Sequence, residues 1–234
     1  MTLVLLVRHG LTATTGSVLT GWTPGIFLDD RGQQQAGALA ARLASLPLDA
    51  IISSPLERCR QTADAIAATG EGRPAAVLDD ERLGECHYGD WTGQPLKRLA
   101  REPLWRVVQA HAGAAQFPGE DGESIMDMQY RAVSAVRDWN RRLGAGATYL
   151  ICSHGDVIKS VIADSLGVHL DMLQRIQVDP CSLTVIRYTP LRPFVLRMND
   201  TGGGVDSLKK PEPKRSRALA RRETDAAVGG GAGG

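Results

Sequence analysis

The sequence predicts an α/β sandwich built around a mostly parallel sheet, and three observations support this class. Short continuous apolar runs alternate along the chain with longer segments in which apolar residues recur at helical spacing. The runs lack the alternation of a half-exposed strand, which is typical of strands buried on both faces. Two runs end in a histidine followed by a glycine, which allows a sharp turn and close approach to a ligand at the binding edge of such a sheet.

In the first half of the chain, the predicted strands are residues 2–7, 48–54 and 75–80. Residues 28–46 predict an amphipathic helix that Asp29 or Asp30 can cap. The sequence SPLE marks the start of the next helix, with Ser54 as the expected N-cap and Pro55 in the first turn.

In the second half, helical patterns cover residues 94–111, 124–143 and 156–166. Ser124 and Asp127 resemble a capping box at the start of the longest of these helices. The predicted strands are 147–153, 182–188 and 192–198, and the last two form an expected antiparallel pair.

The chain has 234 residues and a formal net charge of +1, which predicts neither nucleic acid nor an anionic membrane as a partner. No run approaches the roughly 20 apolar residues of a membrane-spanning helix, and the apolar N-terminus is too short for a signal peptide. We therefore expect a cytoplasmic protein. Residues 1–200 form the expected domain, and residues 201–234, rich in glycine, alanine, proline and charge, form an expected disordered tail.

Four side chains gather at one predicted edge of the sheet. Arg8 and His9 end the first apolar run, and His154 ends a later one. Arg58 lies in the first turn of a helix that follows another run, near the same edge. Helix N-termini favour anions, and arginine offers paired donors that match phosphate oxygens. Two arginines with two imidazoles therefore predict a pocket for a dianionic phosphoryl group.

A proton donor for a leaving oxygen would complete this site, and the segment LGECHYGDWTG at residues 83–93 supplies two acids. A carboxyl group among apolar neighbours has a raised pKa, as a general acid requires. Glu85 is the candidate acid. Asp90 could share the role but is interpreted as a loop residue, and His87 could line a substrate cleft or be structural.

A metal site is one alternative interpretation of these side chains. His9 and His154 with Glu85 could ligate a metal, but the neighbouring arginines would repel a cation. The four cysteines are scattered and form no Cys-x-x-Cys pair, so neither a zinc site nor a disulfide framework is predicted. We expect no metal and no other cofactor.

With these motifs in order, the chain resembles the phosphoglycerate-mutase-like group of the histidine phosphatase superfamily. The resemblance rests on Arg-His-Gly after the first run, SSPLERCRQTA, an E-x-x-x-G-x-W-x-G segment and Ser-His-Gly after a late run, and it extends from about residue 3 to 200. It implies a three-layer α/β/α sandwich with a six-stranded, mostly parallel sheet. The subgroup that the chain most resembles is an actinobacterial group of phosphomutase-like proteins.

The resemblance also implies roles for the residues at the predicted edge. His9 is similar to the family nucleophile, which becomes a phosphohistidine. Arg8, Arg58 and His154 resemble the phosphate pocket, and Glu85 resembles the proton donor.

Two positions near the first motif depart from the family pattern. Leu11 stands where an acidic residue often follows Arg-His-Gly, and Thr15 stands where an asparagine near the phosphate is common. Thr15 could still donate a hydrogen bond to the phosphate and is an expected substrate-binding residue. Gly155, in the Ser-His-Gly motif, is the other one.

These features predict a metal-independent phosphomonoesterase that acts on a small phosphorylated metabolite through a phosphohistidine. Two alternatives stay open: a phosphomutase, and a non-catalytic protein that binds a phosphorylated ligand. The resemblance implies that mutases carry a longer insertion between the acid and the second histidine, which closes the site. The stretch from Glu85 to His154 is shorter than such a cap requires, so water can reach the phosphohistidine, and this favours hydrolysis. Non-catalytic relatives tend to lose the nucleophile or the acid, and this chain keeps both. The substrate and the oligomeric state, a homodimer included, stay open.

Overall fold

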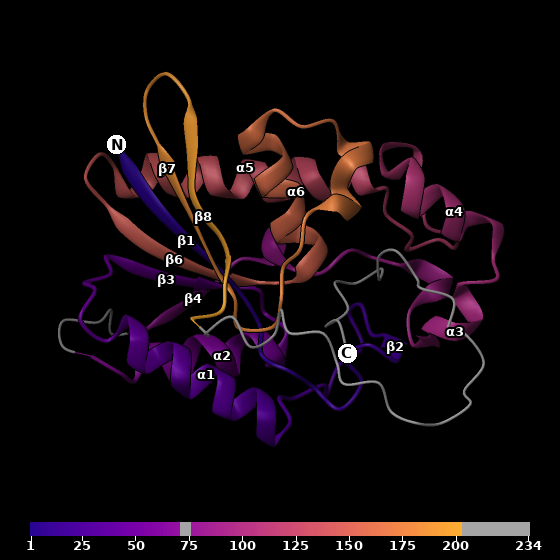
Figure 1. Cartoon of the computed structure of the whole chain (residues 1–234), viewed down its shortest axis with the longest axis horizontal. Helices are drawn as coiled ribbons and strands as arrows, with labels where there is room; N and C mark the ends of the chain where they lie inside the picture. The colour runs from indigo at the N-terminus through magenta and orange to yellow at the C-terminus, as the bar shows by residue number, and fades with distance from the viewer. Residues whose placement is uncertain (71–75, 203–234) are drawn as a thin grey trace, which may run out of the picture.

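A computed structural model of the chain describes residues 1–70 and 76–202, and over this part the chain forms a three-layer α/β/α sandwich (Figure 1). The strands of the central sheet are β1 Thr2–Arg8, β3 Ala50–Ser53, β4 Val77–Asp79, β6 Thr148–Ser153, β7 Leu183–Tyr188 and β8 Pro193–Asp200. The short strands β2 Val18–Leu19 and β5 Gln94–Pro95 pair with each other outside this sheet.

The strand order in the central sheet is β4-β3-β6-β1-β7-β8. Strands β4, β3, β6 and β1 are parallel, whereas β7 runs antiparallel to both β1 and β8. The predicted fold class and the expected antiparallel pair near the end of the chain are therefore confirmed. Because β1, β3 and β6 are parallel neighbours, the residues that follow them meet at one edge of the sheet.

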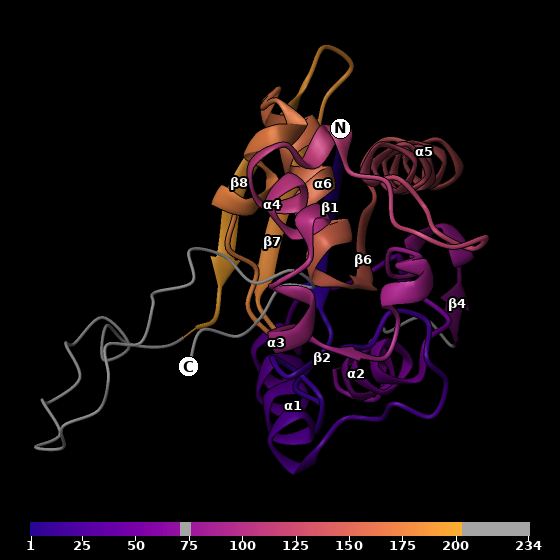
Figure 2. The same ribbon diagram turned by 90° about the vertical axis from the view of Figure 1, so that its right-hand side faces the viewer.

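Helices cover both faces of the sheet (Figure 2). The helices are α1 Asp30–Leu43, α2 Glu57–Ala67, α3 Leu96–Leu99, α4 Pro103–Ala110, α5 Ile125–Leu143 and α6 Gly155–Leu166, with short 3₁₀ helices at Glu81–Leu83, Gly89–Trp91, Ala112–Ala114 and Leu170–Arg175. Helices α1 and α2 pack on one face, and α5 and α6 pack on the other. Helices α3 and α4 lie beyond the edge of the sheet where the site forms.

The apolar side chains of β1 pack alternately into two hydrophobic cores, one on each face of the sheet. Val4 and Leu6 belong to the cluster with α5 and α6, whereas Leu5 and Val7 belong to the cluster with α1 and α2. All four side chains are buried. Successive side chains of a strand point to opposite faces, so a strand with helices on both sides needs apolar residues at every position.

Two of the three predicted helix caps are present. The Asp29 carboxylate accepts a hydrogen bond from the Gly32 amide at 2.8 Å, and the Ser124 hydroxyl accepts one from the Asp127 amide at 2.9 Å. The prediction for Ser54 is wrong, because α2 begins at Glu57 with Leu56 as its N-cap residue. The Ser54 hydroxyl instead lies 2.8 Å from Nε2 of His154, a partner that β6 brings alongside β3.

The single helix predicted over residues 94–111 is also wrong, since this stretch holds β5, α3 and α4. Pro103 begins α4, and Glu102 before it has an extended backbone, as the residue preceding a proline prefers. The predicted strand at 75–80 forms as β4, although its first residue lies outside the described residues. Of the predicted tail, residues 203–234 likewise lie outside the described part.

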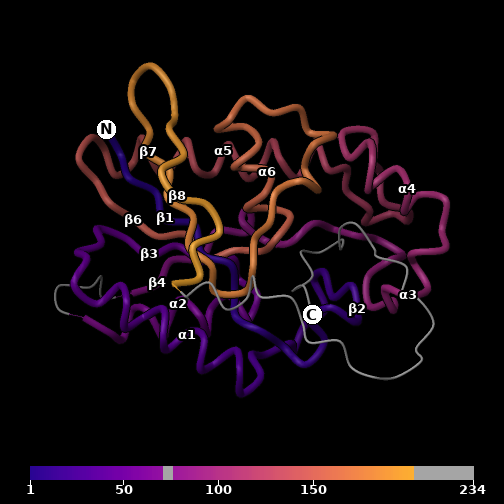
Figure 3. The backbone as a smooth tube through the Cα atoms, in the orientation of Figure 1, coloured from indigo at the N-terminus to yellow at the C-terminus, as the bar shows by residue number. Residues whose placement is uncertain are grey.

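All four cysteines are buried and free. Over the described residues, none of the helices is both long and apolar enough to cross a membrane. The backbone trace in Figure 3 follows the segment after β1 toward α3, where the amide of Leu96 donates to the carbonyl of Ser17 at 3.0 Å. This contact helps to hold the loop between β1 and α1 over the edge of the sheet.

A close crossing of two backbone segments holds the loop after His9 against α1. The Asp29 amide donates to the Leu11 carbonyl at 3.0 Å, and a Cβ on Gly10 would lie 2.6 Å from the Gly32 carbonyl oxygen. A Cβ on Gly32 would collide with the Leu11 backbone. The glycine after the histidine is thus required where two protein segments approach each other.

We expect Gly32→Ala to lower the free energy of unfolding by about 2 to 3 kcal/mol, because a clash between backbones cannot be relieved by side-chain rotation. Urea denaturation measures the change. Gly37→Ala on the same helix is the matched control: nothing lies within 4 Å of its added Cβ, so we expect a gain of about 0.5 to 1 kcal/mol. Equal stability of the two variants would contradict the role of the crossing.

Candidate active site

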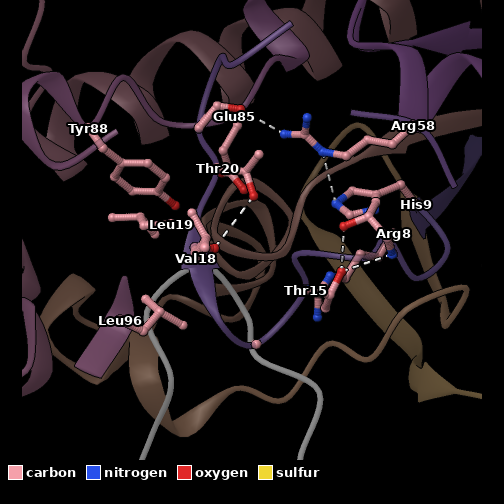
Figure 4. A pocket seen from close by; sticks show the side chains of 13 residues that line it. Arg8, His9, Thr15, Val18, Leu19, Thr20, Arg58, Glu85, Tyr88 and Leu96 are labelled. Atoms are coloured by element: carbon pink, nitrogen blue, oxygen red, sulfur yellow. Dashed lines mark hydrogen bonds between the residues drawn. The ribbon is translucent and has the colours of Figure 1, made fainter. Parts of the chain in front are cut away.

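A pocket opens at the edge of the sheet where β1, β3 and β6 end (Figure 4). The pocket and its mouth enclose about 410 Å³, a volume that includes space open to solvent. The lining residues are Arg8, His9, Thr12, Thr15, Gly16, Val18, Leu19, Thr20, Gly21, Arg58, Glu85, Tyr88 and Leu96. Five of the residues predicted from the sequence therefore lie around one pocket.

His9 follows β1, and its ring is held in one tautomer. Nδ1 lies 2.7 Å from the Gly10 carbonyl oxygen, which can only accept, so Nδ1 carries the proton. Nε2 then has a free lone pair, which accepts a hydrogen bond from Nε of Arg58 at 3.3 Å. Burial, reinforced by the charges of Arg58 and Arg8, holds the pKa of His9 well below its usual range. The imidazole is therefore neutral at pH 7, with Nε2 available as a nucleophile.

Arg58 lies in the first turn of α2, and its guanidinium contacts the rings of both His9 and His154. Figure 4 shows its approach to His9. Nη2 donates to the Gly21 carbonyl at 2.8 Å and lies 3.3 Å from Nδ1 of His154. Nη1 is buried and has no hydrogen-bond partner within the described part of the chain. An unsatisfied buried donor is costly, and an anion in the pocket would satisfy it.

Arg8 is the last residue of β1 and is also buried. Its Nη1 donates to the Val178 carbonyl at 2.8 Å, which anchors the guanidinium beside His9. Two arginines thus converge on the pocket from β1 and α2.

His154 is the N-cap residue of α6 and is completely buried. Arginine can only donate, so Nδ1 accepts from Arg58 and the proton on Nε2 points to the Ser54 hydroxyl. Burial, helped by the charge of Arg58, holds the pKa of His154 well below its usual range. The ring centroids of His9 and His154 are 5.3 Å apart. His154 therefore lies directly behind the pocket and supports Arg58 there.

Glu85 follows the short helix Glu81–Leu83, and its side chain is buried at the pocket. Oε1 accepts a hydrogen bond from the Cys86 amide at 3.0 Å, and Oε2 lies 3.9 Å from Nδ1 of His154. Burial, reinforced by the charge of Asp156, raises the pKa of Glu85 to about 7 and outweighs the opposing effect of Arg58. The group can therefore both give and take a proton near neutral pH.

Three other candidates lie outside this pocket. Gly155 begins α6 next to His154 and is not one of the lining residues. His87 and Asp90 lie on a second, wider hollow, where the ring of His87 stacks on Trp22 at 4.6 Å. The segment from 85 to 90 thus separates the two hollows, with Glu85 at the first.

Several residues at the site were missed by the sequence analysis. Arg131 in α5 donates to the Glu85 carbonyl at 2.8 Å, and Trp22 donates to the same carbonyl at 2.6 Å, so both hold the Glu85 loop. Tyr88 donates to the buried Asp156 carboxylate at 3.0 Å. Tyr88 lies in the same motif as Glu85, and this position could have identified it as a site residue from the sequence. No local sequence pattern identifies Arg131.

The described residues contain no cluster of three or more His, Cys, Asp or Glu side chains that could hold a metal ion. The positive charge at this edge comes from Arg8 and Arg58. A neutral imidazole, two arginines and a carboxyl group with a pKa near 7 are suited to the transfer of an anionic group with acid–base assistance.

The fold and the pocket define an α/β protein in which a neutral histidine, two arginines and a buried carboxyl group gather at the carboxyl edge of the sheet. The chain belongs to the histidine phosphatase superfamily (branch 1), whose family pattern matches residues 4–201. This membership confirms the family resemblance of the sequence.

Two curated relatives illustrate the range of this family. A protein of Yersinia enterocolitica named "Probable phosphoglycerate mutase GpmB" is 31% identical over 188 residues, which cover 79% of this chain and 84% of the relative. Phosphoserine phosphatase 1 of Hydrogenobacter thermophilus is 29% identical over 212 residues, which cover 86% of this chain and 93% of the relative. The chain is thus similar to relatives that carry mutase and phosphatase names.

Solved structures share the fold over most of the chain. Bacillus stearothermophilus YhfR superposes with a TM-score of 0.76 at 29% identity, covering 86% of this chain and 98% of that one. A phosphoserine phosphatase variant from Entamoeba histolytica, in complex with phosphoserine, superposes with a TM-score of 0.75 at 26% identity and the same coverage.

Proposed function

We propose that the protein is a phosphomonoesterase that acts on a small phosphorylated metabolite through a phosphohistidine at His9. One observation carries this proposal: the neutral His9 ring and the guanidinium of Arg58 line the same pocket, and Nη1 of Arg58 is buried there without a hydrogen-bond partner among the described residues. The His9 imidazole supplies a lone pair to attack phosphorus, and Nη1 of Arg58 can donate a hydrogen bond to a phosphoryl oxygen. The phosphatase relatives support the same conclusion.

In the first step, Nε2 of His9 attacks phosphorus in line with the ester oxygen, so the N–P bond forms as the P–O bond breaks. Arg58 gives up its hydrogen bond to Nε2 and donates to the phosphoryl oxygens together with Arg8. Cations that hold the equatorial oxygens provide most of what phosphoryl transfer needs. Protonated Glu85 gives its proton to the departing alkoxide.

In the second step, the Glu85 carboxylate takes a proton from water, and the resulting nucleophile attacks phosphorus on His9. The N–P bond breaks, inorganic phosphate leaves, and the neutral imidazole returns. Glu85 recovers its proton in this step, so the cycle closes without another co-reactant. His154 keeps Arg58 in place between the two rings, and Thr15, which lines the pocket, remains a proposed substrate contact.

A panel of phosphate esters, assayed with EDTA present, tests this function. We expect release of inorganic phosphate from alkyl and aryl monoesters and a phosphoryl group on His9 during turnover. Binding of phosphate esters without release of phosphate would instead support the non-catalytic alternative.

A phosphomutase is the second candidate, because relatives named phosphoglycerate mutase align with this chain. A phosphohistidine that is stable for minutes and requires a bisphosphate primer would favour it over the hydrolase. Membership of the actinobacterial subgroup, a catalytic domain over residues 1–200 and a cytoplasmic location are further proposals that accompany this function.

The pH dependence follows from the pKa of Glu85. The acid form of Glu85 is lost above about pH 7, so we expect kcat/KM for an alkyl phosphate to fall tenfold per pH unit there. Below about pH 6 the substrate loses its dianionic form, so the rate should fall again. The pKa of His9 is held well below its usual range, so His9 is already neutral over the alkaline limb and does not contribute to it.

Nitrophenyl phosphate is the control for this profile. Its leaving group needs little protonation, so its alkaline limb should be shallower or shifted to higher pH. Identical alkaline limbs for both esters would count against Glu85 as the proton donor.

A further inference from the structure

The two ends of the pocket differ in chemistry (Figure 4). Among the described residues that line the pocket, the cations are Arg8 and Arg58, and both lie at the His9 end. On the other side of the pocket in Figure 4 lie Val18, Leu19, Thr20, Tyr88 and Leu96, which we call the neutral wall. Thr15 lies beside His9 and Arg8, and Thr12 is hydrogen-bonded to Thr15 there. Apart from Glu85, the proposed proton donor, the part of a substrate beyond the phosphoryl group therefore meets the uncharged groups of the neutral wall.

The threonine hydroxyls are already linked to one another and to the backbone. Oγ1 of Thr12 and Oγ1 of Thr15 are 2.9 Å apart, and Oγ1 of Thr15 accepts from the Thr12 amide at 3.0 Å. Oγ1 of Thr20 lies 3.5 Å from the Val18 carbonyl oxygen, to which it donates. A hydroxyl can exchange donor and acceptor roles with a substrate hydroxyl, but it supplies no charge.

Tyr88 adds a group of fixed polarity to this wall. Its hydroxyl points into the pocket beside Leu19 (Figure 4), and its single proton is donated to Oδ2 of Asp156 at 3.0 Å. Asp156 is completely buried, and its Oδ1 lies 3.5 Å from Nζ of Lys159, which also donates to Gln174. With its proton used in this way, Oη of Tyr88 can only accept a hydrogen bond from a substrate.

This arrangement discriminates between two kinds of ester. A substrate hydroxyl can donate to Oη of Tyr88 and exchange hydrogen bonds with the hydroxyl of Thr20. A substrate carboxylate would bring a further negative charge next to an acceptor, with the Asp156 carboxylate buried behind it. A buried charge needs a partner, and both lining arginines are committed to the phosphoryl end.

We propose that the pocket takes phosphate monoesters of neutral, hydroxylated alcohols, such as a polyol or a sugar, and rejects esters that carry a carboxylate. One hydroxyl of the substrate donates to Oη of Tyr88, which makes Tyr88 a specificity-determining residue. The proposal rests on the proposed function for the binding of the phosphoryl group. It separates this chain from the relatives whose names refer to phosphoserine and phosphoglycerate.

The test compares glycerol 3-phosphate with 3-phosphoglycerate, which differ only in a hydroxymethyl group against a carboxylate. We expect the full-length protein to favour glycerol 3-phosphate by at least 10-fold in kcat/KM. Equal or better use of 3-phosphoglycerate would overturn the proposal. Turnover of nitrophenyl phosphate, which has neither group, reports on the proposed function separately.

Two variants sharpen the test. Tyr88→Phe removes the acceptor, so the preference for glycerol 3-phosphate should fall by about 10-fold. Thr20→Lys places a cation on the neutral wall, so it should raise kcat/KM for 3-phosphoglycerate. The preference for glycerol 3-phosphate then falls because the carboxylate ester is used better, whereas in Tyr88→Phe it falls because glycerol 3-phosphate is used less well. If Tyr88→Phe folds poorly, Thr20→Lys still tests the proposal. An unchanged ratio of kcat/KM for the two esters in Thr20→Lys would show that the neutral wall does not exclude the carboxylate.

Binding provides the same comparison without catalysis. Calorimetric titration of the His9→Ala variant with the two esters should give at least 10-fold tighter binding of glycerol 3-phosphate. If the wild-type protein hydrolyses no ester, the proposed phosphatase function fails while this titration still tests the substrate class. Tighter binding of 3-phosphoglycerate would overturn the inference in either case.

Discussion

Replacing His9 by alanine is expected to lower the turnover of every phosphate ester by about 10⁴- to 10⁶-fold, the scale of effect seen when a nucleophile is removed. Alanine has no lone pair to form the N–P bond, so the covalent route is closed. Arg58 keeps its hydrogen bond to the Gly21 carbonyl, so the phosphate end of the pocket should survive. Steady-state rates and the intact mass of acid-labile phosphoryl-enzyme measure the effect.

His111→Ala is the matched control for this variant. The His111 side chain is 70% exposed and lies outside the pocket, so its loss should change the rate by less than about twofold. Turnover by His9→Ala at the wild-type rate on a nitrophenyl ester would show that another group attacks phosphorus. Loss of the rate in both variants would point to damage to the fold.

Glu85→Gln is expected to lower kcat for an alkyl phosphate by about 10²- to 10⁴-fold, the usual contribution of a general acid. Glutamine keeps the shape of the side chain and can still accept from the Cys86 amide, but it cannot give a proton to an alkoxide. The loss should be much smaller for nitrophenyl phosphate, whose leaving group is stable as an anion. Rates for the two esters, measured at pH 6.5, provide the comparison.

Asp90→Asn is the control acid, because Asp90 lies on the second hollow and away from the pocket. It should keep wild-type rates on both esters. An equal loss for both esters in Glu85→Gln would mean that Glu85 holds the pocket together without donating a proton.

Stability provides an independent check on Glu85. Folding raises the pKa of this carboxyl from 4.5 to about 7, so the folded protein binds the proton more tightly than the unfolded chain. The stabilising contribution is complete below pH 4.5 and is lost as pH rises to about 7, a difference on the order of 3 kcal/mol. Glu85→Gln should therefore unfold at a higher temperature than wild type at pH 8, and this advantage should disappear at pH 5.

The parts of the fold that were predictable depend on neighbours along the chain. The run in β1 has apolar residues on both faces, and Asp29 and Ser124 cap helices that begin a residue later. The wrong prediction for the cap at Ser54 reflects competition between two hydrogen-bond partners. Ser54 has the right residue type and spacing for a cap, but the His154 ring lies within hydrogen-bond distance once β3 and β6 pair.

The candidate site divides in the same way. Arg8 is the last residue of β1, and His9 and His154 come directly after the parallel strands β1 and β6. Their common edge therefore follows from sequence order and strand direction. Arg131 and Asp156 reach the site from α5 and α6 and contact Glu85 and Tyr88 across long sequence separations. No pattern within a single segment encodes such contacts.

By itself, the sequence determined which strands are buried on both faces and which reactive side chains end them, because hydrophobic periodicity and strand-end position are local properties. Only the tertiary structure decided the chemistry of those side chains. The lowered pKa of His9, the raised pKa of Glu85 and the hydrogen bond from Tyr88 to Asp156 each depend on atoms that distant segments bring together where water is excluded. In such surroundings the nearest partner and the loss of solvation set the protonation of a group, and neither can be inferred from its neighbours along the chain.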